Sequence, residues 1–410
     1  MAFINAAGAA RNCAVVEATK TKRIGSWKHW HSYLNSVGIT SIFLDGFSQL
    51  NTNIIMSDFA QAIRQGTFSS RNKTKLVEGS VTTALSHVAQ TFRSNDRKDP
   101  RLDKDGKTCY YLQEQFRGYK NQDEGVKKQK ALPLAVLRKM MELSSTEIQQ
   151  NQTWLLIGAI FFAMRSCEYL RTATSENNKR TNILRLRNFK FKKNGRVLEH
   201  DSQELLDADL VIITFEFQKN NVRNRTVHMF KTGDTLLCPV VAWATTVQRI
   251  LNTVPETSGD TKISSYYVDG TVRDTDSNII RARLRGIVAL IGEKVLGFTK
   301  EEVGLHSIRS GGAMAMFLSN VSEIIIQRVG RWESTAFLEY IREQVENFTH
   351  GVSRRMLENE NFYHLSSLSD STYSNNSTSE KNENPTCNEG GEPLCTPYTV
   401  RYNENIYKEI

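Results

Sequence analysis

Three side chains that could act on a phosphate stand close together between residues 306 and 340. His306 and Arg309 are three residues apart, which places them on one face of a helix or of the turn that leads into it. The segment Gly330-Arg331-Trp332 follows, and Tyr340 comes eight residues after Trp332. An imidazole can move a proton, a guanidinium binds phosphate oxygens, and a phenol can attack as a nucleophile. The residue types and their order therefore predict chemistry on a phosphate.

Two cations further upstream are candidates for the same site. Arg165 ends the longest apolar run of the chain, and Glu168 follows three residues later. Because burying an unpaired arginine is costly, Arg165 should either pair with Glu168, which the residues alone favour, or face a ligand. Lys219 lies at the mouth of a predicted hairpin, and Lys231 at the far end of that hairpin competes with it.

A mainly helical domain over residues 131–364 is expected to position these side chains. Apolar spacing predicts an amphipathic helix after Ala131 and then a buried helix that runs into Arg165. The other expected elements are an antiparallel hairpin over 210–217 and 225–230, and further helices over 240–254 and 281–295. The predicted fold class is therefore mainly α with a small antiparallel sheet, an α+β arrangement.

Residues 23–130 are expected to form a separate helical domain behind a flexible lead of residues 1–22. Four side chains near its start have helical spacing and are interpreted as core rather than as a base-stacking platform: Trp27, Trp30, Tyr33 and Leu34. The basic segment from Arg93 to Lys130 also contains tyrosines and acidic residues. It fits either a solvated surface or one that follows a phosphate backbone. Its end, residues 121–130, is expected to be an interdomain linker.

The positive charge of the chain is unevenly distributed. The net charge is +9, but residues 365–410 hold three Lys or Arg and seven Asp or Glu, which leaves +13 for the first 364 residues. A basic body with an acidic tail is typical of a protein that binds polyanions, although a well-solvated basic surface fits the charge equally well. The tail has too few apolar residues to offset the entropy of ordering and is expected to be disordered.

Cysteine usage and hydropathy exclude several other classes. The six cysteines have no CxxC spacing, so neither a zinc site nor a disulfide framework is predicted. The simplest compartment is therefore a reducing, intracellular one. The apolar run from Trp154 to Met164 is too short to span a bilayer, and the N-terminus lacks the pattern of a secretion signal. No membrane, metal or cofactor is expected.

Taken together, these motifs resemble the active-site boxes of the tyrosine recombinases, the phage-integrase family. The matching residues occur in the family's order: Arg165 with Glu168, Lys219, His306-x-x-Arg309, Gly330-Arg331-Trp332 and Tyr340. The hairpin that runs into Cys238-Pro239 resembles eukaryotic mobile-element recombinases of the Crypton or DIRS-like kind. Trp332 stands where many members have a histidine, and it lies one residue closer to the tyrosine than the commonest spacing.

The resemblance implies a fold, an activity and a role for each residue. It implies a helical core-binding domain followed by a catalytic domain, which cleaves and rejoins DNA through a 3′-phosphotyrosyl intermediate without a metal. Tyr340 would be the nucleophile and His306 its base or orienter. Arg165 and Arg309 would hold the phosphate. Lys219 would protonate the leaving 5′-oxygen, and the indole N–H of Trp332 would donate to a phosphate oxygen.

The expected partner is double-stranded DNA, with a homo-tetramer assembled on two duplexes, and the expected location is the nucleus if the host is eukaryotic. Two other interpretations remain open. A type IB topoisomerase would use similar chemistry to relax supercoils as a monomer. A recombinase-derived DNA-binding protein would have lost its activity. The target DNA sequence, and the choice between integration, excision and inversion, do not follow from the residues.

Overall fold

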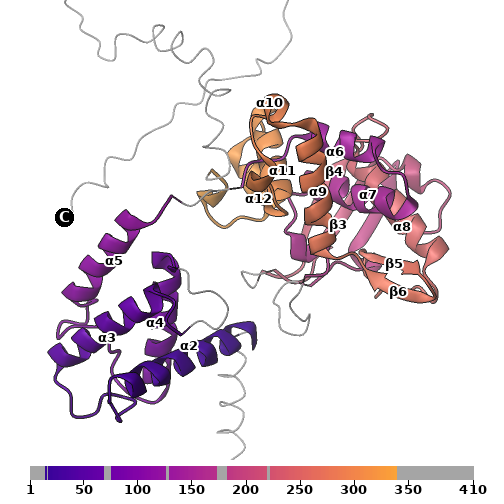
Figure 1. Cartoon of the computed structure of the whole chain (residues 1–410). Helices are drawn as coiled ribbons and strands as arrows, with labels where there is room; N and C mark the ends of the chain where they lie inside the picture. Colours follow the sequence, from indigo (N-terminus) through magenta and orange to yellow (C-terminus); the bar gives the residue numbers. More distant parts are fainter. Residues whose placement is uncertain are drawn as a thin grey trace, which may run out of the picture. The chain divides into compact units, whose positions relative to one another are not determined.

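The computed structural model describes residues 14, 15, 17–68, 75–125, 129–172, 182–218 and 222–338. Helices dominate these residues, with one four-stranded antiparallel sheet and one two-stranded hairpin (Figure 1). The predicted fold class, mainly α with a small antiparallel sheet, is confirmed. The expected tail of residues 365–410 lies outside the described residues, and the domain boundaries at 130 and 364 stay predictions.

Four helices form what we call the N-terminal bundle: α2 (Glu17–Ser36), α3 (Gln49–Arg64), α4 (Glu78–Ser94) and α5 (Tyr110–Gln122). Trp30, Phe59 and Phe92 are buried at its centre, and the indole N–H of Trp30 donates to the Ile42 carbonyl at 2.9 Å. The interpretation of the early aromatic residues as core is therefore confirmed for Trp30 and for its buried neighbours Tyr33 and Leu34.

Helix α2 begins earlier than the sequence suggested. The flexible lead was expected to reach residue 22, but α2 starts at Glu17. An acidic residue in the first turn interacts favourably with the helix dipole, and Glu17 also pairs with Lys20 at 3.1 Å. The helix thus begins six residues before the expected start at Arg23.

Nearby acidic residues form ion pairs with some arginines of the basic segment that begins at Arg93. Arg97 pairs with Asp45 at 2.7 Å, and Arg101 pairs with Asp99 at 2.8 Å. Tyr119 is buried, and its hydroxyl donates to Gln61 at 2.6 Å, whereas Tyr110 and Tyr111 are exposed. These arginines and Tyr119 serve the bundle itself, and a surface that follows a phosphate backbone stays a prediction for the rest of the segment.

The second hydrophobic core is built around helix α7 (Glu147–Phe161), which packs against α6 (Leu134–Glu142), α8 (Pro239–Thr253) and α11 (His306–Leu318) (Figure 1). The middle of α7 is buried on all sides, as predicted for a helix that is apolar all round. Gly158 lets α7 pack closely against α8, because a Cβ at that position would overlap the ring of Trp243.

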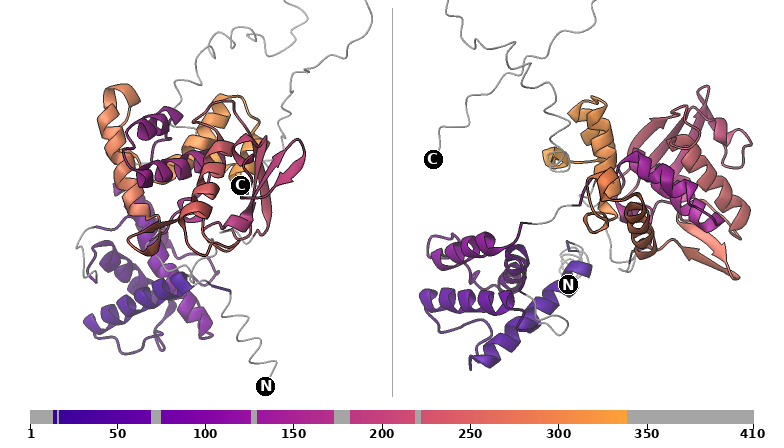
Figure 2. Two further views of the ribbon diagram at one scale, coloured as in Figure 1. Left: turned by 90° about the vertical axis from the view of Figure 1, so that its right-hand side faces the viewer. Right: turned by 45° about the horizontal axis from the view of Figure 1, so that its top comes forward.

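The four-stranded sheet has the strand order β2-β1-β3-β4, with all neighbours antiparallel. Figure 2 shows this part of the chain from two further directions. Its strands are β1 (Phe189–Lys193), β2 (Arg196–Leu198), β3 (Leu210–Phe215) and β4 (Arg225–Phe230). The predicted hairpin is β3–β4, and the range of β4 is the predicted one. The strand expected to reach residue 217 ends at Phe215, because Glu216 there turns to bind Arg187 and Asn188.

Three further helices complete this part: α9 (Ser277–Ile291), α10 (Glu293–Leu296) and α12 (Glu323–Gly330). The helix expected over 281–295 is α9, which lies four residues earlier at both ends. Asp276 caps its start by accepting from the Asn278 N–H at 2.7 Å, and Gly292, with a φ of +88°, ends it. A hairpin of β5 (Ser265–Val268) and β6 (Thr271–Asp274) was not predicted.

The start of α11 is fastened to the segment that precedes α6. The backbone N–H groups of Lys130 and Leu132 donate to the carbonyls of Glu302 and Ser307, at 2.9 and 3.0 Å. A Cβ at Gly311 would overlap the Leu132 carbonyl, so this approach requires glycine. In the part of the chain that the structure describes, no helix has the length and apolar character needed to cross a bilayer.

Candidate active site

Arg165 lies just beyond α7, where the chain turns sharply. Ala163 has a φ of +42°, and Arg165 then precedes the 3₁₀ turn η1 (Ser166–Glu168). The Glu168 carboxylate accepts from the Arg165 backbone N–H at 2.8 Å and from its guanidinium at 3.1 Å. The predicted Arg165–Glu168 pairing is present. The Arg165 side chain nevertheless keeps 22% of its surface exposed, so it can also meet a ligand.

Glu168 is buried between two arginines. Its second partner is Arg331, whose Nη2 lies 2.7 Å from Oε2, and both side chains of this pair are 1% exposed. Burial lowers the pKa of Arg331 to about 10, and the charges of Arg165 and Arg225 act in the same direction, while Glu168 opposes them. The sequence placed Arg331 in a motif but gave it no role, because its partner Glu168 is 163 residues away.

Arg309 is buried one turn into α11. Its guanidinium donates to the carbonyl oxygens of Ala163 and, at 2.6 Å, of Gly330. The Arg309 Cζ also lies 4.1 Å from the centre of the Trp332 ring. Backbone carbonyls orient a guanidinium without cancelling its charge. These contacts fix the orientation of the Arg309 guanidinium.

Trp332 packs its ring between Arg309 and Phe337, whose ring centre is 5.8 Å away. The turn before it must be glycine, because a Cβ on Gly330 would overlap the Trp332 ring. Gly330 therefore fixes the position of the indole over Arg309. Whether the indole N–H meets a phosphate, as the resemblance implies, stays a prediction.

His306 is the first residue of α11 and lies three residues before Arg309. Although the residue is exposed at the surface, desolvation of its ring by the surrounding protein lowers its pKa from the ordinary value of 6.5. The positive charges of Arg309 and Arg165 lower the His306 pKa further. Because both guanidinium charges disfavour a proton on His306, they favour its neutral imidazole form.

The two remaining predicted residues, Lys219 and Tyr340, lie outside the described residues. The competitor Lys231 is described, and it follows the end of β4 that pairs with Leu210. Its Nζ donates to the Leu206 carbonyl at 3.1 Å. Arg331 stacks on Phe215 at the other end of β3, five residues and about 17 Å along the strand. Lys231 is therefore remote from the arginine cluster.

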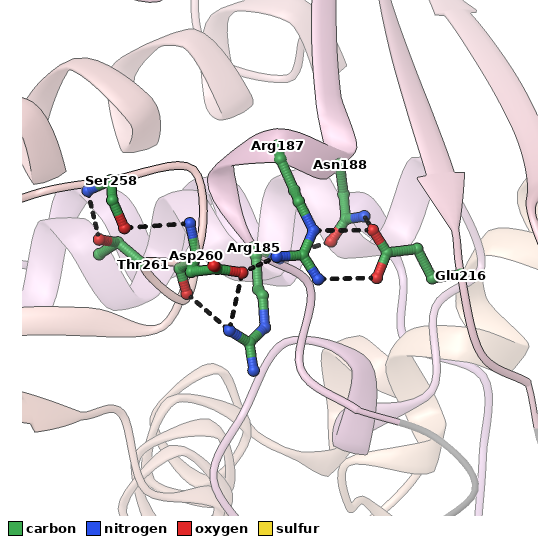
Figure 3. Close-up of polar contacts among 7 residues, drawn as sticks. All are labelled: Arg185, Arg187, Asn188, Glu216, Ser258, Asp260 and Thr261. Atoms are coloured by element: carbon green, nitrogen blue, oxygen red, sulfur yellow. Dashed lines mark hydrogen bonds and ion pairs between the residues drawn. The ribbon is translucent and has the colours of Figure 1, made fainter.

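Part of a second group of charged residues lines the same cavity as Glu168. Figure 3 shows that this group is internally paired. The carboxylate of Glu216, just after β3, accepts hydrogen bonds from the Arg187 guanidinium at 2.9 and 3.1 Å and from the Asn188 amide at 2.9 Å. Asp260 forms an ion pair with Arg185 at 3.0 Å and another with Arg187. These acids and arginines alternate in a chain, so their charges compensate one another. The Arg165 cluster differs: among its described residues, Glu168 pairs with both Arg165 and Arg331, so two guanidinium groups share one carboxylate.

No family model matches this chain, and no curated protein matches it either. Several solved structures resemble it, and three of them follow. The Tn1549 transposon integrase in complex with circular intermediate DNA is 10% identical, with a TM-score of 0.46, over 81% of this chain and 99% of that one. The XerH site-specific recombinase bound to palindromic difH substrate is 14% identical, with a TM-score of 0.43, over 80% and 75%. A lambda integrase dimer bound to a COC′ core site is 12% identical, with a TM-score of 0.38, over 76% and 94%. These three solved structures are thus of integrases or of a recombinase, each with a TM-score below 0.5.

Proposed function

We propose that this protein is a site-specific DNA recombinase or integrase, which cleaves and rejoins strands through a covalent 3′-phosphotyrosyl intermediate on Tyr340. The observation that carries the proposal is the cluster of Arg165, Arg309, His306 and Trp332, assembled from segments up to 167 residues apart. Such a cluster of cations beside an ionisable imidazole suits a phosphodiester whose negative charge increases in the transition state.

The two catalytic arginines have different tasks in this mechanism. Arg309 is rigid and buried, so it provides a fixed positive charge for one phosphate oxygen. Arg165 is partly exposed and can turn its free N–H groups towards the substrate while Glu168 holds the other side. Each guanidinium contributes on the order of 3 kcal/mol to the transition state, by analogy with one oxyanion-hole donor.

Proton transfer requires a base for Tyr340 and an acid for the leaving 5′-oxygen. His306 suits the first task, because its lowered pKa keeps the imidazole neutral and able to accept a proton near pH 7. We assign the second task to Lys219, since Lys231 is bound to Leu206 at the remote end of the sheet. General acid catalysis of this kind is worth about 10²–10⁴ in rate. No step calls for a metal ion.

The proposed substrate is double-stranded DNA, and the proposed assembly is a homo-tetramer on two duplexes. The excess positive charge of the first 364 residues supports a polyanionic partner. In a eukaryotic host the protein would act in the nucleus.

Trapping of a covalent protein–DNA adduct tests the proposed function. The wild-type chain is incubated with a library of nicked duplexes of randomised sequence, and adducts are isolated under denaturing conditions and sequenced. We expect adducts with the wild type and with the exposed-tyrosine control Y267F, with or without EDTA, and none with Y340F. Adducts that persist in Y340F would refute the assigned nucleophile. A strict need for a divalent metal would refute the mechanism, and relaxation of a supercoiled plasmid by the monomer without site preference would favour a topoisomerase.

A further inference from the structure

Arg331 has an unusual backbone for a residue with a long side chain. It follows the last residue of α12 with φ +58° and ψ +45°, the left-handed region that glycine adopts most easily. The residue is nevertheless an arginine and is 2% exposed. A side chain that is kept in a disfavoured conformation and buried with its charge must be held there by strong interactions.

The guanidinium of Arg331 provides these interactions by joining four segments. Its Nη2 binds Glu168 at 2.7 Å, and its Nη1 donates to the carbonyls of Val329 and Phe162, both at 3.1 Å. Its Cζ lies 3.6 Å from the centre of the Phe215 ring at the end of β3. One side chain thus connects the end of α12, the residue after α7, the turn η1 and the sheet.

These contacts surround Arg165 without including it. Phe162 comes three residues before Arg165, and Glu168 comes three residues after it. Arg331 therefore hydrogen-bonds to the loop on both sides of Arg165. Glu168 in turn binds the Arg165 guanidinium through its other oxygen. A displacement of Arg331 would therefore move Arg165 in two ways, through the backbone of the loop and through the Glu168 carboxylate.

We propose that Arg331 is a positioning residue, which holds Glu168 and the loop of residues 162–168 so that Arg165 faces the substrate phosphate. The proposal rests on the proposed function, since it concerns the same site. Because Trp332 is the next residue, Arg331 also links the position of Trp332 to that of Arg165. It also explains why an arginine occupies a turn whose backbone glycine would adopt without strain.

Substitutions at Arg331 separate this role from a general contribution to folding. R331G keeps the turn and relieves its backbone, R331M keeps the bulk without the charge, and R331K keeps the charge but cannot reach all four partners. The control is R328M, which removes an exposed arginine from the same helix. The readout is the single-turnover rate of adduct formation on the nicked randomised duplexes, measured beside the thermal midpoint and the Kd for the same DNA.

We expect R331M and R331G to slow adduct formation on the order of 10²-fold, the cost of misplacing a catalytic group by about 1 Å. The Kd should change little, R331K should recover part of the rate, and R328M should match the wild type. In the R165K background, R331M should cost little more, because a residue that acts through Arg165 has no effect once Arg165 is compromised.

Two outcomes would overturn the proposal while leaving the proposed function intact. One is a normal rate in folded R331G. The other is a full, multiplicative loss when R331M is added to R165K, which would mean that Arg331 acts independently of Arg165. The absence of adducts with the wild-type chain would instead refute the proposed function, and the role of Arg331 with it.

Discussion

Asp123 in the N-terminal bundle and Glu168 beside the candidate site both bind a buried arginine, but the charge around them differs. Asp123 pairs with Arg64 at 2.5 Å, and its other partner is the neutral N–H of Glu78 at the start of α4. Glu168 binds the guanidinium groups of both Arg165 and Arg331. The first group is electrically balanced and joins α3 to the end of α5. In the second, the described contacts set two guanidinium groups against one carboxylate.

Replacement of the arginine in each group should have the largest and most different effects. R165A should slow adduct formation about 10²–10³-fold with little loss of stability, because Glu168 keeps Arg331 as its partner. R64A should cost about 1.5–3 kcal/mol of unfolding free energy, since it removes a buried guanidinium that donates to the Leu76 and Tyr119 carbonyls, and it should spare the cleavage step. Adduct kinetics and urea unfolding of both variants measure this contrast. A large loss of stability in R165A, with the cleavage rate preserved, would mean that both groups are structural.

The aromatic ring over Arg309 offers a second contrast. G330A should disturb the site, because the added methyl group displaces Trp332 at a cost of about 1–3 kcal/mol. The matched control G286A has open space around it on α9 and should gain up to about 1 kcal/mol of stability from helix propensity. Tryptophan fluorescence and adduct rates would report the displacement. Unchanged values of both in G330A would show that Trp332 does not depend on this glycine.

His306 and His87 both have lowered pKa values but belong to different parts of the chain. For His87 the cause is burial, followed by the charges of Arg23 and Lys22. Because each folded-state pKa lies below the unfolded value of 6.5, the unfolded chain takes up the proton first as the pH falls. Each histidine should therefore reduce stability as the pH drops below 6.5, with no effect above it.

Activity should distinguish the two histidines. The adduct rate, measured between about pH 5 and pH 8, should fall at the acid end as His306 becomes protonated. H306N should lower the rate and abolish this acid limb, whereas H87N should keep it. An acid limb that survives in H306N would assign the proton transfer to another group.

The smallest effect is expected in the balanced charges of Figure 3. Arg187 is 43% exposed and Glu216 is 27% exposed, so E216Q should cost about 1 kcal/mol or less in a urea titration. Its effect on the adduct rate should be far smaller than that of R165A. A loss comparable to that of R165A would place this network in the catalytic site.

Much of the fold could be predicted because its signals are local. The apolar residues of α7 and the β-branched residues of β3 and β4 indicate buried elements directly. The β5–β6 hairpin was missed although Asp269-Gly270 is a strong turn signal, since its strands are short and mostly exposed. The pairing of Arg165 with Glu168 could be predicted for the same reason, as the two residues are one turn apart.

The rest of the site depends on contacts between distant segments. Nothing near Arg331 in the sequence indicates that it binds Glu168, and nothing near Arg309 indicates that the carbonyls of Ala163 and Gly330 orient it. The glycines of the 310–313 segment resembled a motif, but only packing shows that Gly311 and Gly312 make room for backbone carbonyls of Leu132 and Ile160.

The attachment of Lys130 and Leu132 to the start of α11 has a mechanical consequence. The N–H of Leu132 is bound to Ser307, the residue between His306 and the rest of the helix that holds Arg309. A pulling force on the preceding segment would therefore be transmitted to the imidazole and the guanidinium together. We therefore expect a displacement of the residues just before α6 to move the side chains of His306 and Arg309 in concert.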